Sequence, residues 1–79
     1  MKKKLHKVTC EYELDQCLLS LVKLAKSKTK VKLFNVWFPT SNFSKIFLSN
    51  IPNVFKENNI DQQQNLHVSV YIEEGLNDE

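Results

Sequence analysis

Two histidines and two cysteines suggest a zinc site in this 79-residue chain. Thiolates and imidazoles are the usual ligands of zinc, so His6, Cys10, Cys17 and His67 are the set to consider. Zinc ligands mostly come in pairs about two to four residues apart, whereas six residues separate Cys10 from Cys17. Both cysteines also fall on apolar faces of predicted elements, so we expect buried structural thiols and no metal site.

Residues with catalytic potential show no arrangement that is typical of an enzyme. The chain has no nucleophile elbow, phosphate-binding loop or dinucleotide fingerprint. Its one glycine, Gly75, cannot build a loop whose backbone amides surround a phosphate. Glu11, Glu13 and Asp15 cluster, but acidic side chains at a helix start complement the helix dipole. We therefore expect neither catalysis nor a bound cofactor.

Lysines give the chain a candidate nucleic-acid surface. Residues 1–45 carry ten lysines and three acidic residues, a net charge of +7, and residues 46–79 carry one lysine and six acidic residues, a net charge of −5. The candidate contacts are Lys2, Lys3, Lys4, Lys7, Lys28, Lys30 and Lys32, with Phe34 and Trp37 among them as stacking platforms. Arginine, the main base-reading residue, is absent. This reading predicts only weak, non-specific and salt-dependent binding, and a solvated basic face explains the lysines more simply.

The length and composition indicate one folded domain, residues 1–79, with flexible ends at 1–4 and 74–79. The chain is 42% hydrophobic and 25% charged, a globular balance rather than a disordered one. The lysines at the start resemble the first part of a signal peptide, but the apolar stretch that should follow them is missing. No apolar run is long enough to span a bilayer. Two cysteines are too few for a disulfide framework. These features favour a cytoplasmic protein.

Three segments have the patterns of strands. Residues 5–12 alternate, with Val8, Cys10 and Tyr12 on the apolar side. Residues 30–38 are apolar on both sides and end at Pro39, which is typical of a central strand. Residues 66–72 alternate apolar and polar side chains, as in a strand with one buried face.

Two segments have helical spacing. Apolar residues from Leu14 to Ala25 recur on one helical face. A second apolar face runs from Phe43 to Phe55, with Thr40 or Ser41 as a possible cap. Pro52 interrupts this stretch, so we expect one kinked helix or two short helices, the second capped by Asn50. The polar segment 57–65 is a predicted loop.

The order strand, helix, strand, helix, strand predicts a small two-layer βαβαβ sandwich. Right-handed crossovers in one direction give a mainly parallel three-stranded sheet in the order 1-2-3 with both helices on one face. A mixed sheet, or a ferredoxin-like arrangement with a further strand, is the alternative. We assign Phe34, Val36 and Phe38 to the helix side and Trp37 to the open side, because Asn35 makes that side the more polar.

An open sheet face or edge makes protein binding the predicted function. The candidate contacts are Val31, Leu33 and Trp37 from the central strand, and His67 and Tyr71 from the third. Exposed apolar surface on a small domain commonly marks an interface, although lysine stems, the loop or the tail could cover this one. The partner is another protein or a second copy. The lysine- and asparagine-rich composition suggests a phage or mobile-element protein that inhibits or redirects a host factor.

Overall fold

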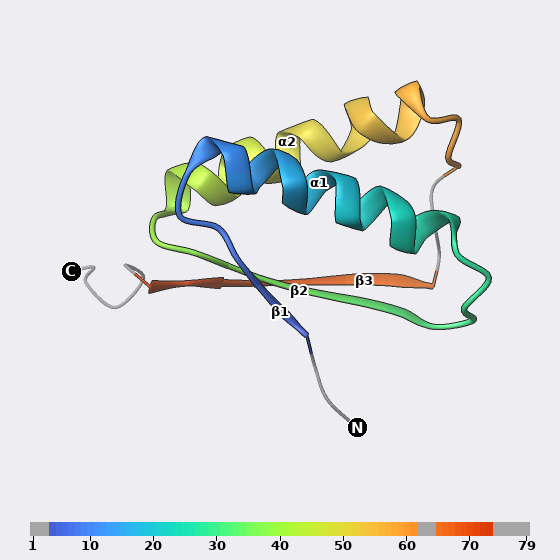
Figure 1. Cartoon of the computed structure of the whole chain (residues 1–79), viewed down its shortest axis with the longest axis horizontal. Helices are drawn as coiled ribbons and strands as arrows, with labels where there is room; N and C mark the ends of the chain where they lie inside the picture. The colour runs from blue at the N-terminus through green and yellow to red at the C-terminus, as the bar shows by residue number, and fades with distance from the viewer. Residues whose placement is uncertain (1–3, 62–64, 74–79) are drawn as a thin grey trace.

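A computed structural model describes residues 4–61 and 65–73 of the chain, and confirms the predicted fold class (Figure 1). The elements follow the order β1 (Leu5–Lys7), α1 (Glu11–Lys26), β2 (Lys32–Phe38), α2 (Ser41–Glu57) and β3 (Leu66–Ile72). The three strands form one parallel sheet in the order β1-β2-β3. Both helices lie on the same face of the sheet. Apart from Lys4, the ends predicted to be flexible lie outside the described residues.

The hydrophobic core fills the layer between the sheet and the helices. Its sheet side comes mainly from Phe34, Val36 and Phe38, each at most 2% exposed. Phe47 of α2 packs against two of these rings, with its ring centroid 5.3 Å from that of Phe38 and 6.3 Å from that of Phe34. The remaining buried apolar residues are Val8, Leu14, Cys17, Leu18, Leu21, Val22, Ala25 and Phe55.

The first strand is much shorter than the predicted 5–12, and α1 begins earlier than predicted. Glu13 explains the difference, because its carboxylate accepts hydrogen bonds from both the N–H and the hydroxyl of Thr9, each at 2.7 Å. These bonds attach Thr9 to the first turn of α1, and Cys10, whose backbone is still extended, is the N-cap residue. Tyr12 therefore lies on the helix and is 70% exposed. The alternation of Val8, Cys10 and Tyr12 does not reflect a strand beyond Lys7.

The second helix is a single element that continues through Pro52. Asn50 does not start another helix, since its side-chain amide donates to the carbonyl oxygen of Ile46 at 2.9 Å. Thr40 occupies the N-cap position, but its side chain makes no capping hydrogen bond. The helix ends at a turn in which Asn59 adopts the left-handed conformation (φ 57°), a conformation asparagine tolerates well. Pro52 is exposed, so the packing of the apolar face continues on either side of it.

Candidate functional site

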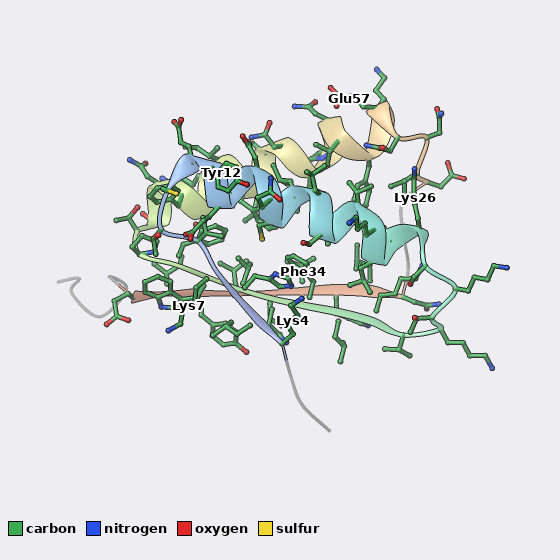
Figure 2. The ribbon with its side chains drawn as sticks, viewed as in Figure 1. Lys4, Lys7, Tyr12, Lys26, Phe34 and Glu57 are labelled. Carbon is green, nitrogen blue, oxygen red and sulfur yellow. The ribbon has the colours of Figure 1, made fainter. Side chains whose placement is uncertain are left out.

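Strand alternation decides which residues of β2 reach the open face of the sheet. Phe34, Val36 and Phe38 are buried under the helices, as predicted, and Figure 2 shows Phe34 on the helix side. Leu33, Asn35 and Trp37 have the opposite parity and therefore point away from the helices. The predicted orientation of the central strand is correct.

The parallel register places residues of the three strands in rows across the open face. Trp37 pairs with Lys7 of β1 on one side and with Tyr71 of β3 on the other. In the next row Asn35 lies between Leu5 and Ser69, and beyond it Leu33 pairs with His67. Four of the five predicted protein-binding residues are thereby brought together. We call Leu5, Lys7, Leu33, Asn35, Trp37, His67, Ser69 and Tyr71 the open face.

Several apolar side chains of the open face are well exposed. The exposed fraction is 60% for Leu33, 51% for Tyr71 and 44% for Leu5. Trp37 is only partly exposed, because it is the middle residue of its row and has a neighbour on each side. Val31, the fifth predicted residue, lies one residue before β2 and is 59% exposed. No described helix covers this side of the sheet (Figure 1).

Leu5 and Lys7 are members of the open face that the sequence analysis did not include. Their parity within β1 follows from the pairing of Leu5 with Asn35 and of Lys7 with Trp37. The available signal was the two-residue spacing of Leu5 and Lys7, which matches that of Leu33, Asn35 and Trp37. The prediction of one long strand over residues 5–12 instead took Val8, Cys10 and Tyr12 as the side chains that mark its apolar side.

Of the predicted nucleic-acid contacts, Lys32 is misplaced. Strand parity turns its side chain toward the helices, where it is 7% exposed, and its ammonium donates to the carbonyl oxygen of Ala25 at 2.8 Å. That carbonyl belongs to the last turn of α1, where a cation is favourable. Lys32 thus joins α1 to the sheet and does not contribute to a basic surface.

The other described lysines of that prediction come from two separate segments of the chain. Lys4 and Lys7 are exposed on or beside β1, whereas Lys28 and Lys30 are exposed in the connection between α1 and β2. Lys2 and Lys3 lie outside the described residues. Lys7 is the one predicted lysine that the register places within the open face.

The two cysteines differ sharply in their surroundings. Cys17 is buried in the core, and burial raises the pKa of its thiol to about 12. Cys10 precedes α1 and is exposed, so the prediction that both thiols are buried is wrong for Cys10. Among residues 4–61 and 65–73, no three His, Cys, Asp or Glu side chains lie close enough together to hold a metal ion.

His6 faces the helices instead of the open face. Its ring stacks on Phe34 with a centroid distance of 4.3 Å and an interplanar angle of 16°. Burial lowers the pKa of His6, and the positive charge of Lys4 lowers it further. His6 is therefore a packing residue of the short first strand.

The topology itself bears on the kind of ligand this sheet can bind. In open α/β sheets, small ligands bind at the carboxyl ends of the strands, where neighbouring helices lie on opposite faces and leave a crevice. Here both described helices cover one face, so the sheet lacks that arrangement of helices on opposite faces (Figure 1). A pocket does lie at the same end of the sheet, between the starts of the two helices, and its lining includes Glu11, Thr40 and Asn42.

Neither helix in the described part of the chain is long and apolar enough to cross a membrane. Comparisons of the chain with protein-family models, with curated proteins and with solved structures gave no match.

Proposed function

We propose that this protein is a non-enzymatic interaction module that binds another protein through its open face. The observation that carries the proposal is the half-exposed group of Leu5, Leu33 and Tyr71 around Trp37, on a side of the sheet that no described helix covers. Contiguous apolar surface of this kind commonly marks an interface in small domains. Tryptophan and tyrosine are also the residues most enriched at binding hot spots.

Lys7 gives the proposed partner its chemistry. It is the one charged side chain within the paired rows of the open face, and it lies beside Trp37. A complementary surface would present an apolar patch to Trp37 and Tyr71 and an acidic side chain to Lys7. We therefore propose an apolar protein surface with an acidic rim as the ligand.

The biological setting is part of the same proposal. The chain has eleven basic residues, all lysine, and eight asparagines, a composition that fits an AT-rich coding sequence. We propose a cytoplasmic phage or mobile-element protein that inhibits or redirects a host protein by covering one of its surfaces.

One observation favours a second candidate, single-stranded nucleic acid. The row Lys7, Trp37, Tyr71 combines a cation with two aromatic rings on an open sheet, and bases can stack on such rings. The exposed leucines of the same face and the burial of Lys32 weigh toward protein.

The test compares the wild type with Trp37→Ala and Tyr71→Ala as immobilised baits for lysate proteins at low and high salt. Leu19→Ala is the matched control, because Leu19 is 55% exposed but lies on α1, away from the open face. Circular dichroism verifies that each variant is folded. For a partner identified in this way, calorimetry with the purified protein should show that Trp37→Ala costs at least about 2 kcal/mol of binding free energy.

Each outcome has a defined meaning. A partner that survives high salt, binds the wild type and Leu19→Ala, and is lost with Trp37→Ala and Tyr71→Ala supports the proposal. Nucleic acid recovered at low salt and lost at high salt supports the second candidate. Partners captured equally by all four proteins would show that the open face is not the binding surface.

A further inference from the structure

Within residues 4–61 and 65–73, the β3 edge of the sheet lacks three features by which proteins discourage strand pairing. Short strands, charged side chains and prolines protect an edge. At the opposite edge, β1 has three residues and is preceded by Lys4 and ended by Lys7. β3 has seven residues, none of them charged and none proline, and Glu73 directly follows it. Within residues 4–61 and 65–73, β2 is its only strand neighbour.

The backbone polarity of β3 follows from one hydrogen bond and the parallel register. The N–H of Lys32 donates to the carbonyl oxygen of Asn65 at 3.0 Å. In a parallel ladder alternate residues face the same neighbour, so His67, Ser69 and Tyr71 also direct their backbone groups toward β2. The intervening residues direct their N–H and C=O groups to the free edge: Leu66, Val68, Val70 and Ile72.

We propose that β3 pairs antiparallel with β3 of a second copy of this chain, about a two-fold axis at Ser69. The sequence of β3, LHVSVYI, reads alike in both directions about Ser69. In this register Leu66 faces Ile72, His67 faces Tyr71, Val68 faces Val70, and Ser69 faces itself. Aliphatic side chains meet aliphatic ones, the ring of His67 meets that of Tyr71, and no like charges are opposed.

The same register satisfies the hydrogen-bonding pattern. Residues that direct their backbone groups to the edge must face each other to exchange both hydrogen bonds. Leu66 with Ile72 and Val68 with Val70 meet this condition, each twice by symmetry. These pairs give about eight backbone hydrogen bonds between the two copies, which is close to the roughly ten hydrogen bonds of a typical protein interface. Shifting the two-fold axis to Val68 or Val70 would leave edge-directed groups unpaired.

Helix α2 leaves room for this pairing and adds to it. Because α2 contacts both β2 and β3, it lies over the space between them. With strands about 4.8 Å apart, the two copies of α2 would lie about 10 Å apart, which is the usual helix packing distance. Leu48, near the middle of α2, is 47% exposed. Leu48 is four residues before Pro52 and seven before Phe55, so the three residues lie on the same side of α2. Pro52 and Phe55 line a groove together with Leu66 of β3.

The size of the interface sets the expected affinity. A seven-residue strand is about 23 Å long, and a sheet with one helix layer is about 20 Å thick, so the contact covers roughly 900 Å² over both copies. This is below the roughly 1,200 to 2,000 Å² of stable complexes, so we expect a weak, reversible dimer. The short, lysine-flanked β1 would form both outer edges, so assembly would stop at two copies. This dimer is independent of the proposed function, and it would join two open faces into one.

Sedimentation equilibrium from about 1 µM to 1 mM tests the proposal with four variants. Ser69→Lys places two like charges opposite each other at the axis and should weaken the dimer about tenfold or more. His67→Lys adds the same charge on the same strand but faces Tyr71, so it should leave the Kd within a few-fold of wild type. An equimolar mixture of Ser69→Lys with Ser69→Glu should restore the dimer. Trp37→Ala, on the open face but away from the edge, should dimerise like the wild type.

Two results would overturn the proposal. One is a wild-type protein that stays monomeric up to about 1 mM. The other is a dimer that Trp37→Ala and His67→Lys disrupt as much as Ser69→Lys does, because that pattern identifies pairing through the open faces. Circular dichroism of each variant separates loss of pairing from loss of fold, and since Ser69 and His67 are exposed in the monomer, both lysine variants should fold.

Discussion

Replacing Phe47 with alanine should remove most of the stability of this domain. Phe47 has no exposed surface, and its ring contacts those of Phe34 and Phe38 at the middle of the core. A buried Phe→Ala substitution costs about 3 to 5 kcal/mol through lost burial and the cavity that remains. The two aromatic contacts place Phe47 toward the upper end of that range.

The expected loss is large compared with the total stability. A 79-residue domain has a free energy of unfolding of about 4 to 12 kcal/mol. A loss of about 3 kcal/mol or more should lower the melting temperature by at least about 12 °C in a domain of this size. Thermal unfolding followed by circular dichroism, together with urea titrations, measures both quantities.

Ile46→Ala is the matched control, because Ile46 is the preceding residue of α2 and is 48% exposed. Its loss should stay below about 1.5 kcal/mol, since only part of the side chain leaves an apolar environment. Equal losses for Phe47→Ala and Ile46→Ala would mean that α2 presents a different face to the sheet. A Phe47→Ala variant as stable as the wild type would refute the assignment of the core.

Three further predictions concern ionisable groups. Burial lowers the pKa of His6 below its usual value, so the unfolded chain binds more protons than the folded one as the pH drops from about 7 to 5. The free energy of unfolding should therefore fall over this range. His6→Gln should lose part of this pH dependence, which urea titrations at several pH values measure. Hydrogen bonds from the hydroxyl and N–H of Thr9 lower the pKa of Glu13 in the folded protein. They therefore stabilise the fold above about pH 4.5, and this stabilisation is lost as the pH falls through the pKa that Glu13 has in the folded state. Glu13→Gln should flatten the acid limb of the stability profile, and an unchanged limb would contradict the role of that bond. A maleimide should label one thiol, Cys10, in the native protein, because burial raises the pKa of Cys17 to about 12; two thiols labelled without unfolding would show that Cys17 is accessible.

The two sides of the central strand were predictable because side-chain alternation is a local property of the chain. The segment from Lys30 to Phe38 is apolar on both sides, which identifies it as the middle strand. Asn35 identifies which of the two sides faces solvent. The one-sided alternation of residues 66–72 likewise predicts an edge strand with one buried face. From these patterns and the right-handed crossover rule, the strand order and the helix-covered face follow.

Contacts between distant residues explain what the patterns missed. Lys32 is polar, yet its parity is that of Phe34, and the carbonyl of Ala25 gives its ammonium a buried partner. The hydrogen bonds from Thr9 to Glu13 attach the chain after β1 to the first turn of α1, and Cys10 lies exposed between the two elements. Packing of the apolar face of α2 holds the helix together across Pro52, although proline removes a helical hydrogen bond.

The sequence by itself therefore determined the type and order of the elements, the central position of β2 and the side on which Trp37 lies, since hydrophobic periodicity is encoded residue by residue. Only the tertiary structure decided which side chains share the open face. The register that sets Lys7 and Tyr71 on either side of Trp37 depends on how three separate strands align, and no single segment carries that information. The same alignment places β3 at an edge of the sheet, where the near-symmetry of its sequence about Ser69 permits the proposed pairing with a second copy.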